Sequence, residues 1–330
     1  MRTVRTLLMI LGAALFVAVL IRVGPGAVVR LFAELSWFLP LIVVFPYAVM
    51  TSLDTLGWRF AFRRDVVPFR SLLAARLAGE AFNMTTPTAS VGGEAVKAWF
   101  IRPYVPLTES LASVVIAKTA ITIGQALYLA VGLVMAMAVL PGTSTLLQVM
   151  QWLLGLELLG VGGFVAVQAF GVLGAGGRML QRLGFVAPAA GAEVMDRVDS
   201  ALVHFYRKEP ARLALSITCH FLGWVLGALE VYLILWALGM PVSLATAVVI
   251  DAFGSGIGFA AFLVPARLGA AEAGQVAVFM ALGLGAPAGL TFALVQRLRE
   301  ATWTGLGFLA LTTLRATAPP PVAAALEAEG

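Results

Sequence analysis

The stretch that decides the fold of this chain is Phe82–Trp99, which reads Phe-Asn-Met-Thr-Thr-Pro-Thr-Ala-Ser-Val-Gly-Gly-Glu-Ala-Val-Lys-Ala-Trp. It concentrates polar and small residues, whereas the sequence on both sides is apolar. Pro87 and the pair Gly92-Gly93 oppose a continuous helix. Broken backbone at membrane depth is tolerated only where protein buries it or where it lines a watery cavity. The stretch therefore predicts an interrupted helix beside a cavity.

A second and less complete copy of this pattern lies at Val264–Gln275. In both copies a proline precedes a Glu-Ala pair by seven residues, and a lysine or arginine follows the glutamate after 24 or 25 residues. The corresponding positions are Pro87, Glu94 and Lys118 in the first copy and Pro265, Glu272 and Arg297 in the second. We interpret the two copies as an internal repeat.

The composition of the 330-residue chain is that of an integral membrane protein. It is 61% hydrophobic and only 12% charged, whereas soluble domains carry about 25% charged residues. The single cysteine, Cys219, excludes an internal disulfide framework, and His204 and His220 are too few for a Cys/His metal cluster. The net charge of +5 comes from basic residues at the ends of apolar runs, which argues for membrane orientation and against nucleic-acid binding.

Six stretches have the roughly 20 apolar residues that a membrane-spanning helix needs. They are approximately Thr6–Arg22, Trp37–Trp58, Leu107–Leu140, Leu146–Leu173, Leu213–Leu238 and Leu290–Leu314. The first lacks a small-x-small cleavage site, so we interpret it as an uncleaved span. Two more regions, Leu72–Ile101 and Leu244–Leu284, are interrupted at the repeated motifs, and each is expected to form a re-entrant helical hairpin or a pair of half-length helices. The sequence thus predicts an all-α polytopic membrane protein.

Lysine and arginine predict the orientation of these spans. They collect before the first span, after the second, between the fourth and fifth, and after the sixth, whereas the turns Pro141–Thr145 and Gly239–Ser243 carry none. Arg22 and Arg30 are exceptions on the first outer loop. This balance places both termini in the cytoplasm. The first interrupted region then opens from the cytoplasm and the second from outside, an inverted repeat of the kind that many transporters use.

We expect one integral membrane domain over residues 1–315, followed by a disordered tail at 316–330. The connection at residues 174–210 is expected to be cytoplasmic. It contains apolar residues at helical spacing, namely Met195, Val198, Leu202 and Phe205. This pattern predicts an amphipathic helix on the lipid headgroups, with Arg207 and Lys208 near anionic lipid, or alternatively a solvated linker helix.

Glu94 is the first candidate for function. An intramembrane carboxylate is costly and usually faces a cavity, a partner charge or a polar substrate. Gly92 and Gly93 would let backbone N–H groups approach a ligand, and a helix that starts there presents its positive end. Lys97 would strengthen this site for an anionic phosphate. The alternative is a structural salt bridge from Glu94 to Lys97 or to Lys118.

The second motif offers a matching set, Glu272 with Arg267 and Arg297. Arginine can hold a phosphate or carboxylate with two parallel hydrogen bonds, which lysine cannot. The plainer alternative is that Arg267 and Arg299 simply reach the outer membrane interface.

Further polar residues lie in or near the two motifs. Asn83 and Thr86 could bind a headgroup hydroxyl, but they equally satisfy backbone groups that the break leaves unpaired. Glu80 could line the same cavity or pair with Arg76. Asp251 could bind a coupling cation or proton, or cap the helix that follows it. No Ser/His/Asp order, metal-ligand spacing or cofactor motif emerges, so we expect no catalytic centre, metal or cofactor.

At this point the sequence resembles the lysylphosphatidylglycerol synthase transmembrane-region family, which is flippase-like. The residues that carry the resemblance are Gly79-Glu80, Pro87, Gly92-Gly93-Glu94, Lys118, Pro265, Leu268-Gly269, Glu272 and Arg297. A subgroup associated with hopanoid biosynthesis is similar in length. The resemblance implies lipid translocation across the bacterial inner membrane. It does not extend to a synthase domain, and Thr88 and Ala270-Ala271 depart from the family pattern.

The resulting hypothesis is a flippase without its own ATPase. The headgroup of a lipid, anionic or glycosylated, would cross through a cavity between the two interrupted regions. The alternative is a scaffold that passes lipid intermediates to a separate biosynthetic enzyme, with residues 174–210 as the docking surface. A homo-oligomer is compatible with either hypothesis.

Overall fold

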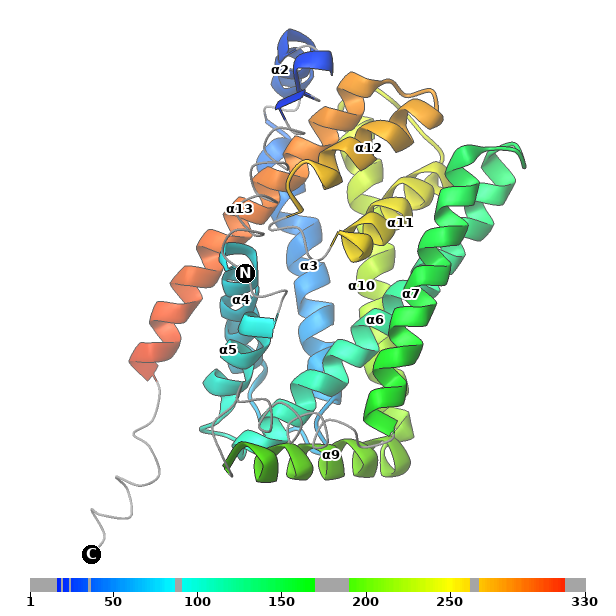
Figure 1. Ribbon diagram of the computed structural model, residues 1–330. Helices are drawn as coiled ribbons and strands as arrows, with labels where there is room; N and C mark the ends of the chain where they lie inside the picture. Colours follow the sequence, from blue (N-terminus) through cyan, green and yellow to red (C-terminus); the bar gives the residue numbers. More distant parts are fainter. Residues whose placement is uncertain are drawn as a thin grey trace, which may run out of the picture.

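The computed structural model describes residues 17–18, 20–23, 25–34, 37–86, 91–169, 190–261 and 267–317. Within these ranges every regular element is helical (Figure 1). Four helices are long and apolar enough to cross a membrane, namely α3 (Leu39–Phe60), α6 (Leu107–Val139), α7 (Thr145–Ala169) and α10 (Pro210–Ala237). They correspond to the second to fifth expected spans and confirm an all-helical membrane protein.

The first and sixth expected spans are not among these four helices. Most of Thr6–Arg22 lies outside the described residues. The first complete helix that the structure describes after it is α2 (Pro25–Glu34). The sixth falls within α13 (Ala286–Thr317), a continuous helix of 32 residues. Its apolar sequence is interrupted by the charged residues Arg297, Arg299 and Glu300. Its length suffices to cross a bilayer, but its charges lower its hydropathy. The number of full spans therefore stays a prediction.

The first interrupted region forms two short helices, α4 (Phe69–Thr85) and α5 (Val91–Ile101), that pack against each other as a hairpin. Pro87, Thr88 and Ser90 lie outside the described residues. Near the turn, Asn83 accepts a hydrogen bond from the backbone N–H of Gly93 at 2.7 Å. Gly79, one turn before Asn83 on α4, contacts Gly93 and Lys97 of α5. The approach is so close that a methyl group on Gly93 would overlap the carbonyl oxygen of Gly79. Glycine at both positions therefore lets the hairpin close.

The second interrupted region also forms two short helices in contact, α11 (Leu244–Ala260) and α12 (Ala270–Ala281). Pro265 lies outside the described residues. Gly254 packs on Gln275, and Gly274 packs on Ile257. α12 begins after Gly269, whose φ of 77° lies in the left-handed region that favours glycine.

The two hairpins enter the molecule from opposite ends (Figure 1). α4 and α5 lie at the end that α9 (Ala190–Lys208) covers, whereas α11 and α12 lie at the end of α2. This arrangement is what an inverted repeat would produce, although a symmetry between the two halves stays a prediction.

The sequence led us to expect an amphipathic helix on the lipid headgroups. The observed helix, α9, has protein beneath its apolar face. It lies across the ends of α6 and α7 (Figure 1), and Val198, Leu202 and Phe205 are buried in a core with residues of α3 and α4. The Tyr206 hydroxyl donates to Gln168 of α7 at 2.5 Å. The apolar face of α9 therefore packs on protein, and the contact of Arg207 and Lys208 with anionic lipid stays a prediction.

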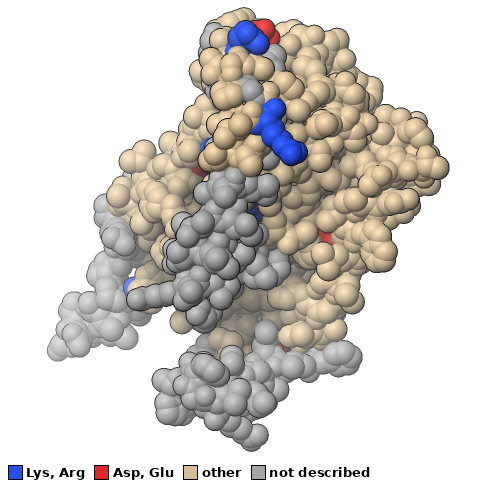
Figure 2. Space-filling view, turned by 45° about the horizontal axis from the view of Figure 1, so that its top comes forward, with Lys and Arg blue, Asp and Glu red and all other residues tan. Residues whose placement is uncertain are grey.

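A loop at the α9 end carries an ion pair that faces water. Arg212 donates to Asp65 at 2.6 Å, and this hydrogen bond lowers the pKa of the Asp65 carboxyl, which therefore stays ionised at neutral pH. On the face that Figure 2 shows, most of the described atoms are uncharged, and the most prominent charged side chains lie toward its top. Such a surface suits contact with lipid tails.

The close contact between α4 and α5 generates a stability prediction. Gly93→Ala should destabilise the protein by about 1–3 kcal/mol, because the added methyl group forces the two hairpin helices apart. The matched control is Gly155→Ala on α7, where nothing lies within 4 Å of the new methyl group. That change should be neutral or stabilising by up to about 1 kcal/mol. Thermal unfolding in detergent, followed by tryptophan fluorescence, measures both, and equal midpoints would contradict the predicted hairpin packing.

Candidate functional site

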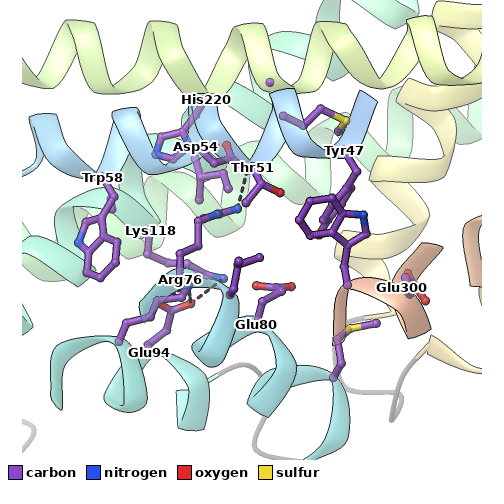
Figure 3. A pocket seen from close by; sticks show the side chains of 18 of the residues that line it. Tyr47, Thr51, Asp54, Trp58, Arg76, Glu80, Glu94, Lys118, His220 and Glu300 are labelled. Carbon is purple, nitrogen blue, oxygen red and sulfur yellow. Dashed lines mark hydrogen bonds and ion pairs between the residues drawn. The ribbon is translucent and has the colours of Figure 1, made fainter. Parts of the chain in front are cut away.

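A polar stripe runs along one face of α3. Tyr47, Thr51, Asp54 and Trp58 recur at steps of four, three and four residues, which places them on the same side of the helix. This side forms one wall of a cavity in the interior of the molecule (Figure 3). The same spacing is visible in the sequence and is the signal by which Asp54 could have been found.

The cavity lies between α3, α4, α5, α6, α10 and α13, and its volume is about 280 Å³. The residues on its walls that can carry charge are Asp54, Arg76, Glu80, Glu94, Lys97, Lys118, His220, Arg267, Arg299 and Glu300. Small-molecule pockets typically measure about 300–1,000 Å³, so the volume suits a compact polar group and excludes a whole lipid with its tails.

Asp54 joins three helices at the centre of this cavity. One of its oxygens accepts from Arg76 of α4 at 2.5 Å, and the other accepts from Nδ1 of His220 on α10 at 2.8 Å. Figure 3 shows the Arg76 side chain directed at Asp54 beside His220. Arg76 therefore forms its ion pair with Asp54, and of the two alternatives that the sequence offered for Glu80, the structure shows the cavity position.

Glu94 lies on the cavity wall, as the sequence suggested. It occupies the first turn of α5, and its side chain is 19% exposed. Lys97 donates to both of its carboxylate oxygens, at 3.0 and 3.1 Å, whereas the Lys118 ammonium stays 3.9 Å away. The Lys118 side chain is also 42% exposed. Glu94 is thus tightly paired with Lys97, which leaves Lys118 the more available of the two cations.

The charges of the second motif form a chain that only partly reaches the cavity. Arg267 lines the cavity and donates to Glu300 at 2.7 Å, and Arg297 donates to the other oxygen of Glu300 at 2.9 Å. Arg297 also donates to Glu272 at 2.6 Å. Glu272 is 1% exposed, and its second oxygen accepts from the backbone N–H of Gly269. Glu272 and Arg297 are therefore not among the cavity walls; they hold the start of α12 against α13.

The backbone of Arg267 has a φ of 53°, which is uncommon for a residue with a side chain. Its guanidinium group passes close to Gly258 of α11 and reaches the cavity. Among the described residues of the second hairpin, Arg267 contributes a charge to the cavity. Because its side chain is 37% exposed, contact of Arg267 with the outer interface stays a prediction.

Arg299 was not among the site residues that the sequence suggested, whereas Glu80 was expected to line the cavity or to pair with Arg76. Arg299 lines the cavity, pairs with the buried Glu230 of α10 and lies over the Tyr47 ring at 4.9 Å from its centroid. Glu80 projects into the cavity from α4 (Figure 3), and no described residue forms a hydrogen bond or an ion pair with its carboxylate. Within the described ranges, Glu80 is thus a cavity carboxylate without a direct ion-pair partner.

The remaining predicted residues serve the backbone or lie elsewhere. Asn83 and Gly93 close the first hairpin, and the Thr86 hydroxyl donates to the Phe82 carbonyl at 2.6 Å near the end of α4. Gly92 is in the first turn of α5 and does not line the cavity. Asp251 accepts from the Tyr128 hydroxyl at 2.9 Å, packs on Gly227 and is also absent from the cavity wall.

Within the described ranges no group of three or more His, Cys, Asp and Glu side chains is placed to hold a metal ion. The cavity chemistry that the described residues offer is therefore that of paired cations and carboxylates. Aromatic rings of Tyr47, Trp58, Trp224 and Trp303 complete its walls. Such walls can bind an ionic or hydroxyl-rich group and keep it apart from lipid tails.

The Asp54 junction generates a prediction on stability. Asp54→Asn should destabilise the protein by about 3–5 kcal/mol, because it leaves the buried Arg76 without a counter-charge. Adding Arg76→Gln should recover part of this loss, since the unpaired charge is removed. Asp65→Asn serves as the control, because its pair with Arg212 is exposed and should contribute at most about 1 kcal/mol. Additive effects of the two cavity substitutions in chemical denaturation would contradict the proposed pair.

The chain also resembles known proteins over nearly its whole length. A protein of Methanothermobacter thermautotrophicus described as a UPF0104 membrane protein is 25% identical over 320 residues, which cover 88% of this chain and 90% of that protein. No solved structure matches the chain. Residues 7–307 match the family described as the lysylphosphatidylglycerol synthase TM region. This match confirms the resemblance that the motifs indicated, and the chain belongs to the lysylphosphatidylglycerol synthase TM region family.

Proposed function

We propose that this protein translocates a lipid with a polar headgroup, anionic or glycosylated, across the inner membrane of the cell. The headgroup would enter the charged cavity while the tails stay in the bilayer. The observation that carries the proposal is a cavity of about 280 Å³ lined by ionisable residues inside a membrane protein. Charged groups at such depth are costly, so their concentration at one place argues for a polar substrate.

The position of the cavity supports translocation in particular. Its walls include α4 and α5 of the first hairpin and Arg267 of the second, and the two hairpins enter from opposite ends. A rocking motion of either hairpin would open the cavity to one side at a time, as in transporters built from inverted repeats. We also propose that both termini are cytoplasmic and that the protein has no ATPase or catalytic activity of its own.

Lys118 is the best-placed residue for an anionic headgroup. Its ammonium group is the more exposed cation of the Glu94 cluster and lies 3.9 Å from the nearest carboxylate oxygen. A phosphate could therefore bind Lys118 without displacing the tighter Lys97–Glu94 pair. Arg267 on the opposite hairpin would supply a second contact with two parallel donors.

Reconstitution into liposomes tests this proposal. Fluorescent phosphatidylglycerol labelled on its headgroup serves as the anionic probe, and a membrane-impermeant reductant reports how fast the label reaches the outer leaflet. Purified protein should accelerate this exchange, and Lys118→Gln should slow it about tenfold, since a charge-assisted hydrogen bond is worth about 1.5–3 kcal/mol. Arg102→Gln is the matched control, because Arg102 stacks on Trp99 and does not line the cavity.

Two results would count against the proposal. Exchange no faster than in protein-free liposomes would contradict translocation of anionic lipid and would favour the scaffold alternative. Equal exchange by the wild-type protein and Lys118→Gln, with Arg102→Gln also unchanged, would place the headgroup path outside this cavity.

A further inference from the structure

A second ionisable feature lies away from the cavity, on α7. The surface of this helix is largely exposed, with Leu156, Leu158 and Leu159 all on the outside of the molecule. Glu157, between them in sequence, is instead 0% exposed. The side chain therefore points into the protein while its neighbours face lipid.

The contacts one turn to either side locate Glu157 in space. Leu153 packs on Gly256 of α11, and Gly256 also contacts Leu129 of α6. Gly160 packs on Phe259 of α11. Residues three and four positions apart share one face of a helix, so Glu157 lies on the face that Leu153 and Gly160 define. Glu157 therefore occupies the wedge between α7, α11 and α6.

Neither oxygen of the Glu157 carboxyl group has a hydrogen-bond partner among the described residues. The adjacent described helices thus provide no hydrogen bond to this carboxyl group. Glu230 on α10, another buried glutamate, does have a partner in Arg299. Glu157 is thus a fully buried carboxyl group that the described residues leave without a hydrogen-bond partner.

None of the described charged groups on the helices packed against α7 forms a hydrogen bond with Glu157. On α6, Lys118 faces the cavity near Glu94 and Glu109 lies in the first turn of the helix. On α11, Asp251 accepts from Tyr128. The described ionisable residues of α9 lie near the far end of α7, where Tyr206 contacts Gln168. They are Asp196, Arg197, Asp199, His204, Arg207 and Lys208, and none forms an ion pair with Glu157.

An ionised carboxylate without a partner is far costlier in an apolar interior than a neutral acid. In this conformation Glu157 must therefore carry a proton. A buried neutral carboxyl group without partners also has an unused O–H donor and an unused acceptor oxygen. A glutamate at this position therefore does not stabilise the observed conformation. The carboxyl group could release its proton only in a second conformation that exposes it to water.

We propose that Glu157 is a proton-binding site that couples one proton to the movement of the α11–α12 hairpin. Gly256 and Phe259, which close the wedge, both belong to that hairpin. When the hairpin moves away from α7, water reaches the carboxyl group and the O–H bond breaks, which leaves a hydrated carboxylate and releases the proton to that aqueous side. When the hairpin returns, the carboxylate takes up one proton before it is buried again. The coupling to lipid movement rests on the proposed function, whereas the proton site does not.

Infrared spectroscopy of the full-length protein in lipid nanodiscs tests the proton site directly. At neutral pH the wild-type protein should show the carbonyl stretch of a protonated carboxylic acid, and Glu157→Gln should remove one such band. Glu109→Gln is the matched control on the neighbouring helix and should leave the band in place. An unchanged band after Glu157→Gln, in protein that is otherwise folded, would overturn the proposal.

A pH gradient across liposomes tests the coupling. With labelled phosphatidylglycerol as the probe and one proton per lipid, a difference of one pH unit should shift the distribution between leaflets about tenfold. Glu157→Gln should abolish this shift and retain exchange without a gradient. Wild-type exchange that ignores the gradient would overturn the coupling. Absence of any wild-type exchange would contradict the proposed function, and the infrared result would still decide whether Glu157 holds a proton.

Discussion

The structure depends on one constraint: an ionised group in a low-dielectric interior needs an opposite charge or a hydrogen-bond donor nearby. The cavity meets this constraint with pairs that join different helices. Asp54 joins α3 to α4 and α10, and Glu300 joins α13 to the second hairpin. Apolar cores lie on either side, one around α6, α10 and α11 and the other beneath α9. The centre of the molecule is therefore held by ion pairs and its two ends by hydrophobic packing.

The charged residues have two different roles, which follow from whether they are paired. Glu272 and Arg297 satisfy each other and the start of α12, so their contribution is to the position of the hairpin. Lys118 and Glu80 lie on the cavity wall with weak or no partners among the described residues. Charges of the first kind shape the site, and charges of the second kind remain available to a ligand.

The sequence predicted the features that follow from local patterns. The apolar runs corresponded to α3, α6, α7 and α10, and the two interrupted regions correspond to pairs of short helices. The i,i+3 spacing of Glu94 and Lys97 was enough to anticipate their contact.

Features that depend on which helices meet could not be predicted in this way. The spacing of Tyr47, Thr51 and Asp54 marks a polar face on α3, but the sequence does not show that α4 and α10 bring Arg76 and His220 to Asp54. The amphipathic pattern of α9 has the same appearance whether it covers lipid or protein, and here Leu202 and Phe205 cover protein. Glu272 and Glu94 occupy matching positions in the repeat, yet their surroundings differ because Gly269 and Arg297 use both oxygens of Glu272.

The short length of α5 has a consequence for the electrical properties of the molecule. At 1.5 Å per residue, its eleven residues extend about 16 Å, whereas the hydrocarbon layer of a bilayer is about 30 Å thick. At the mid-membrane position that the proposed function requires, the cavity that Glu94 and Arg267 line would leave only a thin apolar layer between its polar walls and the water on each side. The membrane voltage would then fall across two short distances and not across one long one.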